Sequence, residues 1–153
     1  MNTYYFSCSY PLEVGSVVNP GNWGRMIKMY DHRFGNPWVL LRETLFESVR
    51  GKSYPNKPSR LESIFLCEEL EEMLHFLKGS NRVLDLIYEV ELVDSSLPLH
   101  KGCLLHTNIV EQDNYDSLTQ KAYHYWDATS VEHTELVTTS PVRILKRVVI
   151  NRG

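Results

Sequence analysis

The stretch SIFLCEELEEMLHFLKGSNRVLDLIYEVEL, residues 63–92, holds the clearest succession of patterns in the chain. Residues 63–67 form a short apolar run that is typical of a buried strand. Residues 68–79 follow at once, with apolar side chains at helical spacing, acids in the first turn and Lys78 and Gly79 at the end. In residues 82–92 apolar side chains occupy every second position, which predicts a strand. The stretch therefore predicts strand, helix and strand in direct succession. The alternating positions are Leu84, Leu86, Tyr88, Val90 and Leu92.

A short strand, two loops and a helix are predicted before this stretch. Residues 4–9 predict an aromatic strand, and the Gly, Pro and Asn residues of 11–25 predict loop and turn throughout. Asn36 and Pro37 are typical of a helix start, and apolar residues at helical spacing follow as far as Val49, with Gly51 as the predicted stop. We therefore expect a helix over residues 37–50 and a second loop, broken by two prolines, over residues 53–60.

The remainder of the chain predicts mostly strands. Residues 102–106 are interpreted as a strand, residues 115–126 as a short helix, and residues 133–137 and 141–150 as two strands separated by a turn. Because helices gather in the first half and strands in the second, the order favours α+β packing over a doubly wound parallel sheet. No repeat, low-complexity tract or linker interrupts the chain, so we expect a single domain over residues 1–153.

The composition is that of an ordinary globular protein. Of 153 residues, 42% are hydrophobic and 23% are charged, with a net charge of −3. No apolar run is long enough to span a bilayer, and the N-terminus lacks the basic start and apolar core of a secretory signal. Cys8, Cys67 and Cys103 lie far apart, which argues against a disulfide framework and favours a reducing compartment. We therefore expect a cytoplasmic protein that does not associate with membranes.

Familiar nucleotide and metal motifs are absent. The chain has no GxGxxG after a strand, no GxxxxGK[ST] and no HExxH. Its six histidines lack the spacing of metal ligands, so we expect no metal site, and we interpret His124 and His133 as solvated or core-edge residues. A cysteine–histidine hydrolase has no local support either. The end of the chain is basic and could meet phosphates, through Arg143, Lys146, Arg147 and Arg152.

Four stretches carry a family resemblance in their order along the chain. The first, YYFSCSYPLEVGSVVNPGNWG (4–24), is an aromatic strand leading into a glycine-containing loop, and the second, SIFLCEELEEMLHFL (63–77), is a strand running straight into a helix. The third, LIYEVELVD (86–94), is a tyrosine-containing strand, and in the last, HTELVTTSPVRILKRVV (133–149), an acid precedes Leu-Val and a final strand. Together they resemble the motifs of ADP-ribosyltransferases. The first is similar to the opening of small bacterial members, including the rifampin-modifying ones, and the last to the third motif of nucleic-acid-modifying members.

The resemblance implies a fold and an activity. The family fold is a split, bent β-core of two small sheets, and we expect the helices over residues 37–50 and 68–78 to flank its cleft. Its members bind NAD⁺ and transfer the ADP-ribose, which implies NAD as the cofactor and a nucleic acid or a protein as the acceptor, in bacterial toxin, immunity or phage–host conflict. An antitoxin or a phage or host protein is a further candidate partner. The alternatives are an NAD-dependent RNA 2′-phosphotransferase and a catalytically inactive binding module of the same fold.

The resemblance also assigns site residues. The first-motif histidine of the family, which holds the NAD ribose, falls on Phe6 or Ser7, and the second-motif tyrosine, which stacks on nicotinamide, falls on Ile64 or Phe65. The His-Tyr-Glu set is therefore incomplete. A second branch of the superfamily uses Arg, Ser and Glu instead. That set is matched here by Arg60, Ser63 and Glu135.

The chemistry that the resemblance implies requires an acid and a cation. A carboxylate beside the ribose stabilises the cation-like transition state, and Glu135 takes this position, with Glu132 as its local rival. The pyrophosphate requires a cation, and Arg60 is preferred over Arg42 and Arg50, which lie on a predicted helix near acids.

Aromatic side chains would supply a flat surface for nicotinamide. The candidates are Phe65, Tyr125 and Trp126. We expect NAD⁺ to bind between the first strand and the strand at residues 63–67, where it would touch Tyr5, Ser7 and the arginine of that loop.

Overall fold

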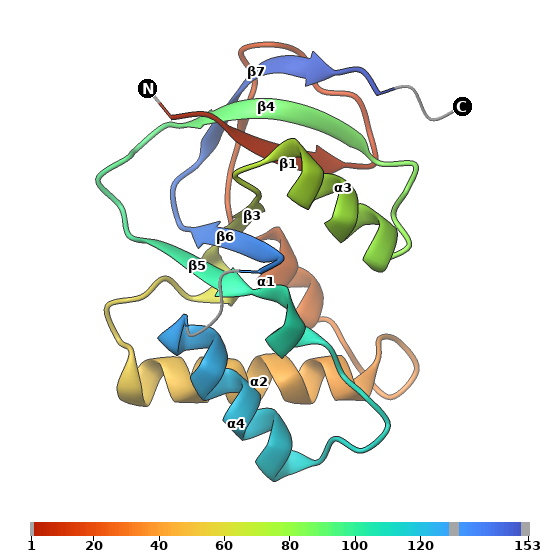
Figure 1. Ribbon diagram of the computed structural model, residues 1–153, viewed down its shortest axis with the longest axis vertical. Coiled ribbons are helices and arrows are strands. Elements are labelled where there is room, and N and C mark those ends of the chain that lie inside the picture. The colour runs from red at the N-terminus through yellow and green to blue at the C-terminus, as the bar shows by residue number, and fades with distance from the viewer. Residues whose placement is uncertain (1, 129–131, 151–153) are drawn as a thin grey trace.

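Strands form two separate antiparallel sheets in the computed structural model, which describes residues 2–128 and 132–150 (Figure 1). The larger sheet has the order β1-β4-β7-β2, built from Tyr4–Cys8, Leu86–Leu92, Val142–Val148 and Val17–Val18. The smaller sheet has the order β3-β6-β5, built from Ile64–Leu66, Thr134–Thr138 and Leu99–Cys103. Every pairing is antiparallel, and the predicted α+β class is confirmed.

The two sheets meet beside β1. The backbone N–H of Tyr5 donates to the carbonyl oxygen of Cys67 at 2.8 Å, and the N–H of Cys67 donates back at 3.0 Å, just beyond the end of β3. The chain also passes directly from β6 in the smaller sheet to β7 in the larger one. Side chains of both sheets share one hydrophobic cluster, so the sheets belong to one folded unit. Its members are Cys8, Ile64, Leu66, Tyr88, Val90, Leu136, Val142 and Ile144.

The strand predicted over residues 82–92 begins later than expected. β4 starts at Leu86, and Leu84 lies before it with 87% of its surface exposed. Tyr88 and Val90 point into the shared cluster, as the alternation predicts. On the opposite face Ile87 is buried with Met73 and Leu77 of α3 (Leu70–Gly79), which covers the larger sheet (Figure 1).

Helix α2 (Pro37–Ser53) starts where the sequence predicts it but ends later. The side chain of Asn36 accepts a hydrogen bond from the N–H of Trp38 at 2.8 Å, with proline at the first position. The helix continues through Gly51, so the predicted stop is wrong. A glycine ends a helix only where the chain turns into the left-handed region. Helix α4 (Tyr115–Asp127) packs against α2 below the smaller sheet (Figure 1).

The region 11–25 is not loop throughout, as the sequence suggests. It contains β2 and helix α1 (Asn22–Ile27), which packs on the short 3₁₀ helix η1 (Arg60–Glu62). Gly24 makes this packing possible, because a Cβ there would lie 1.8 Å from the carbonyl oxygen of Leu61. The strand expected over residues 102–106 is also displaced: β5 ends at Cys103, and the 3₁₀ helix η2 (Leu104–Thr107) follows.

None of the helices in residues 2–128 and 132–150 has the length and apolarity needed to cross a membrane.

Candidate functional site

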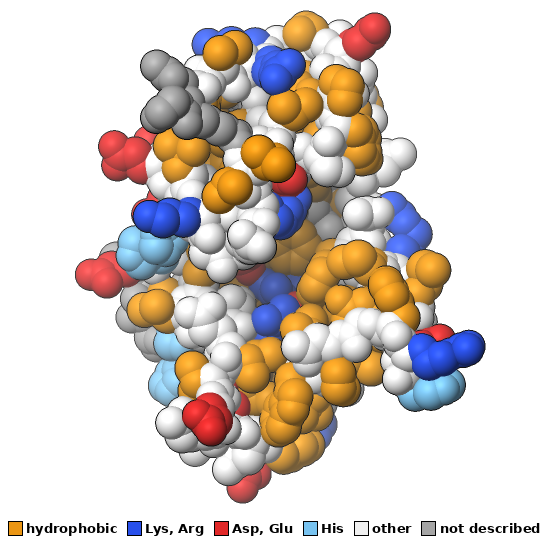
Figure 2. Space-filling model, turned by 90° about the vertical axis from the view of Figure 1, so that its right-hand side faces the viewer, with side chains coloured by type: hydrophobic (Ala, Val, Ile, Leu, Met, Phe, Trp, Pro, Cys, Tyr) orange, Lys and Arg blue, Asp and Glu red, His pale blue; other side chains and the backbone are white. Residues whose placement is uncertain are grey.

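A cleft of about 790 Å³ opens on one side of the molecule. Figure 2 shows it as a hollow with Lys or Arg side chains at its bottom and hydrophobic side chains around it. Residues of β1 and β3 line it together with parts of α1, α3 and η2, so both sheets contribute to its walls. The cleft therefore lies between the first strand and the strand that begins at Ile64, which is the region where the resemblance predicts NAD⁺ binding.

Glu135 and Arg60 lie at the bottom of this cleft and form an ion pair. Only 4% of Glu135 and 5% of Arg60 is exposed, yet both line the cleft. Nη1 of Arg60 donates to Oε1 of Glu135 and, at 2.8 Å, to the hydroxyl oxygen of Tyr125. The hydroxyl of Tyr125 in turn donates to Oε1 of Glu135 at 2.8 Å. Both donors use Oε1, and no side chain or N–H of residues 2–128 and 132–150 donates to Oε2, which is therefore the oxygen that could face a ligand.

The backbone around these three residues explains their close approach. Glu135 lies in β6, the central strand of the smaller sheet, whose five residues are all buried. Its partner across the ladder is Gly102 of β5. A Cβ at Gly102 would lie 2.2 Å from the ring of Tyr125. The glycine therefore leaves the space that brings the tyrosine hydroxyl to the carboxylate.

A second carboxylate, Glu43 of α2, holds Arg60 from the other side. Nε and Nη2 of Arg60 donate to the Glu43 carboxylate at 3.0 and 2.9 Å, and Nη2 of Arg42 donates to it at 3.0 Å. Burial alone would raise the pKa of Glu43, but the two arginines outweigh it and lower the pKa to about 2. Burial likewise opposes the charge of Arg60, yet the surrounding groups, Glu43 first, raise its pKa well above the ordinary value. Both groups are therefore ionised at neutral pH.

This arrangement changes the role expected for Arg60. The sequence assigned it to the pyrophosphate of NAD⁺. Its Nε, Nη1 and Nη2 all donate to groups of the protein, and the side chain is only 6% exposed. Arg60 therefore fixes the Glu135 carboxylate. Arg82, which also lines the cleft, has a side chain that is 44% exposed although it pairs with Asp85.

Most of the other predicted site residues line the cleft. Phe6, Ser7, Ser63 and Phe65 do so, and the guanidinium carbon of Arg60 lies 5.0 Å from the ring centroid of Phe65. Tyr5 is not a lining residue. Its backbone joins β1 to Cys67, and its side chain packs against the cluster below α3.

Tyr125 and Trp126 do not provide the stacking surface that the sequence suggested. Both are completely buried in the cluster between α2 and α4, and neither lines the cleft. Nε1 of Trp126 donates to the carbonyl oxygen of Phe46 at 2.9 Å. Burial raises the pKa of Tyr125 well above its ordinary value, so its hydroxyl stays protonated and donates. These residues are core, and Tyr125 in addition supports Glu135.

Two histidines of the cleft were missed by the sequence reasoning. His75 of α3 and His133, just before β6, both line the cleft, and their rings stack with centroids 3.8 Å apart and planes 11° apart. His133 was interpreted as a solvated or core-edge residue. In the strand predicted over residues 133–137, His133 lies two positions before Glu135, and this spacing is the signal that could have pointed to it. In the structure β6 begins only at Thr134, and His133 has a φ of 49°. The rival acid Glu132 is exposed and is not a lining residue.

Cys67 lines the cleft but is not a nucleophile. Burial, followed by the charges of Glu135 and Glu72, raises the pKa of its thiol to about 12. Since the thiolate is the reactive form, the thiol is inert at neutral pH. In the part of the chain that the structure describes, no three His, Cys, Asp or Glu side chains gather in a way that could hold a metal ion.

One family model matches residues 9–150 of the chain, and its description is "Protein of unknown function (DUF2441)". A search of the curated proteins gives no match.

Proposed function

The chain belongs to the DUF2441 family, whose description assigns no activity, and from its cleft we propose that it is an NAD-dependent ADP-ribosyltransferase. The observation that carries the proposal is the Glu135 carboxylate, which is held by Arg60 and Tyr125 at the bottom of a cleft between two small antiparallel sheets. Cleavage of the nicotinamide–ribose bond develops positive charge on the ribose. A carboxylate fixed in advance stabilises that charge without having to reorganise during the reaction.

The size and walls of the cleft suit a dinucleotide. Its volume of about 790 Å³ lies within the roughly 300–1,000 Å³ that is usual for ligand pockets. Phe6 and Phe65 supply aromatic wall, and Arg60 already occupies one side of Phe65. With Arg60 engaged by carboxylates, Arg82 is the lining cation that a pyrophosphate would reach, because its side chain is 44% exposed. We therefore assign the pyrophosphate to the Arg82 end of the cleft.

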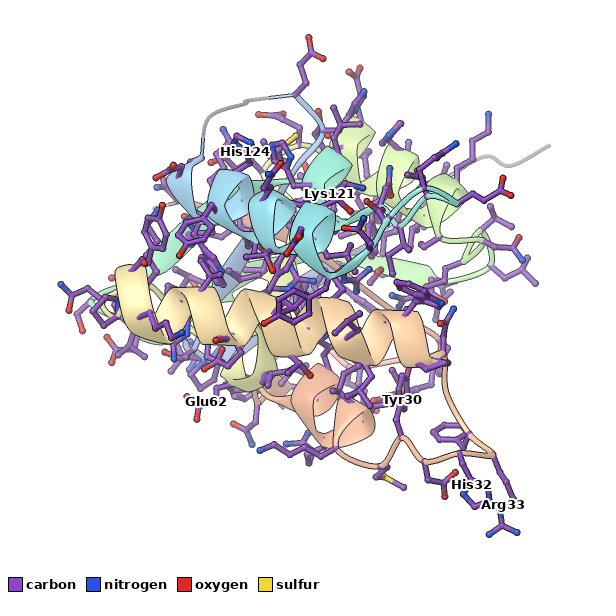
Figure 3. The ribbon with its side chains drawn as sticks, turned by 90° about the horizontal axis from the view of Figure 1, so that it is seen from below. Tyr30, His32, Arg33, Glu62, Lys121 and His124 are labelled. Atoms are coloured by element: carbon purple, nitrogen blue, oxygen red, sulfur yellow. The ribbon has the colours of Figure 1, made fainter. Side chains whose placement is uncertain are left out.

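The loop between α1 and α2 favours a nucleic acid as the acceptor. Arg25 at the end of α1 and Lys28 and Arg33 of the loop are exposed, and within residues 2–128 and 132–150 none of them is in an ion pair. Figure 3 shows His32 and Arg33 at the outer end of this loop, pointing away from the helices. Phe34 beside them is 52% exposed. Exposed cations can contact the phosphates of a single-stranded nucleic acid, and an exposed ring beside them can stack on its bases.

The tip of this loop is held in a fixed shape. Oδ1 of Asp31 accepts hydrogen bonds from the N–H groups of Arg33 and Phe34 at 2.8 and 2.9 Å. The ring of Tyr30 meets that of Phe34 edge to face at 5.5 Å, and Gly35 has a φ of 90° that closes the turn. Little conformational entropy is therefore lost when Phe34 stacks on a base. Because α1 also lines the cleft through Trp23 and Met26, a nucleic acid bound to this loop would lie near the cleft.

A binding module without catalysis is the second candidate. The observation that favours it is that Phe6 and Phe65 line the cleft, where the resemblance places a histidine and a tyrosine. Such a module would bind NAD⁺ without cleaving it.

The test of the proposal uses NAD⁺ carrying a label in its adenylate phosphate. The purified protein is incubated with labelled NAD⁺ and cell lysate, and the products are digested with nuclease or with protease. We expect transfer of label to material that nuclease degrades, with release of nicotinamide. Glu135→Gln is the matched inactive control. NAD⁺ binding by calorimetry without nicotinamide release would favour the binding module, and neither binding nor release would refute both candidates.

A further inference from the structure

His133 and Glu72 form a pair at one wall of the cleft that the proposed chemistry has not yet used. Nδ1 of His133 lies 3.7 Å from Oε2 of Glu72, which projects from α3. Both atoms are shielded from solvent, and neither has a hydrogen-bond partner among the described residues. We propose that His133 is the general base that takes the proton of the acceptor and that Glu72 is the residue that positions it. This inference rests on the proposed function.

The orientation of the ring suits this role. Nδ1 is buried against Glu72, whereas 42% of the His133 side chain is exposed. The exposed edge is therefore the opposite one, which carries Nε2. A carboxylate at Nδ1 favours the tautomer with the proton on Nδ1, which leaves Nε2 as the acceptor of a proton. The ring of His75, stacked at 3.8 Å, limits its rotation.

The pair also lies close to the catalytic carboxylate. His133 directly precedes β6, Glu135 is the second residue of that strand, and both residues line the same cleft. Burial raises the pKa of the Cys67 thiol, and the charges of Glu135 and Glu72 raise it further. Both carboxylates are therefore near this one residue of the cleft wall.

The step balances without a further reactant. A proton moves from the oxygen or nitrogen of the acceptor to Nε2 of His133, and the electron pair of that atom forms a bond to C1′ of the ribose. The bond from C1′ to the nicotinamide nitrogen breaks, and its electron pair stays on that nitrogen, so nicotinamide leaves as a neutral molecule. His133 then returns the proton to water. Glu135 and His133 thus have different tasks, one toward the ribose and the other toward the acceptor.

The experiment measures nicotinamide release from NAD⁺ with water as the acceptor, in the full chain. The variant is His133→Gly, because the backbone of His133 has a φ of 49°, which glycine adopts without strain. We expect a rate loss of about 10²–10⁴-fold, the usual contribution of a general base, and recovery on addition of free imidazole. His124→Gln is the matched histidine control and keeps the full rate, because His124 is exposed on α4 (Figure 3) and does not line the cleft.

A second measurement tests the positioning role of Glu72 without any substrate. Nitrogen NMR of the imidazole is expected to find the neutral His133 protonated at Nδ1 in the wild type, and a mixture of tautomers in Glu72→Gln. Full activity of His133→Gly, loss of activity that imidazole does not restore, or an Nε2-protonated ring in the wild type would each overturn the inference. If the wild type releases no nicotinamide, the proposed function fails and this inference fails with it. An active wild type with an equally active His133→Gly refutes this inference alone.

Discussion

Replacing Glu43 by glutamine should destabilise the protein by roughly 3 kcal/mol. The variant keeps the size of the side chain but removes one of the two carboxylates that face the buried Arg60. The pKa of Glu43 lies near 2 against an ordinary 4.5, and at about 1.4 kcal/mol per pKa unit this corresponds to roughly 3 kcal/mol. Removing one partner of a buried ion pair typically costs about 3–5 kcal/mol, which agrees.

The assay is urea unfolding at pH 7, followed by tryptophan fluorescence. We expect a lower midpoint with an unchanged slope, because the surface exposed on unfolding stays the same. Glu62→Gln is the control. Glu62 is exposed (Figure 3) and ends η1, which begins at Arg60, so its loss should change the free energy of unfolding by less than about 0.5 kcal/mol. A loss below about 1 kcal/mol in Glu43→Gln would refute the argument that this pair holds Arg60 in place.

The pH dependence gives a second check of the same pair. The pKa of Glu43 is lower in the folded than in the unfolded state, so its contribution is complete above about pH 4.5 and is lost as the pH falls toward about 2. The free energies of unfolding of the wild type and of Glu43→Gln should therefore converge over this range. A difference that stays constant down to pH 3 would mean that the charge of Glu43 is not what stabilises the fold.

Three further changes test the site, the strand that carries it and the loop. Glu135→Gln should lower the rate of nicotinamide release about 10²–10³-fold with NAD⁺ affinity retained in calorimetry, while Glu132→Gln stays active. The reverse result would assign the catalytic acid to Glu132 instead. Gly102→Ala should lower stability by about 1–3 kcal/mol in thermal unfolding, because the new Cβ would lie 2.2 Å from the ring of Tyr125. An unchanged melting temperature would contradict this packing. Replacing Arg33 and Phe34 together by serine should weaken binding of a single-stranded oligonucleotide in fluorescence anisotropy and reduce the salt dependence of that binding. Nicotinamide release should stay unchanged. Equal oligonucleotide binding by the wild type and the variant would exclude this loop as the nucleic-acid contact.

The regular elements were predictable because their signals are local. The apolar spacing of residues 68–79 and the alternation of residues 86–92 hold in α3 and β4. The start of α2 was predictable from Asn36 and Pro37, whose capping involves only neighbouring residues. By contrast, α1 is six residues long and depends on the contact of Gly24 with Leu61. A local sequence pattern does not predict a helix that is stabilised by packing against a segment far along the chain.

The candidate site was predictable only in part, for a similar reason. Glu135 and Arg60 came from the resemblance, and the structure brings them into contact. Glu43 could not be found, because an acid in a helix next to an arginine usually faces solvent, and its burial depends on η1 lying against α2. The place of His133 in the cleft was missed because both of its neighbours, Glu72 and His75, come from α3.

The buried group of Arg42, Arg60, Glu43 and Glu135 carries two positive and two negative charges, so it is electrically balanced. Loss of any one member leaves an unmatched charge with little access to water. A change at one of these positions alone therefore lowers the stability of the fold. A joint replacement restores the balance of charge, so among relatives positions 43, 60 and 135 should covary even where the rest of the cleft has diverged.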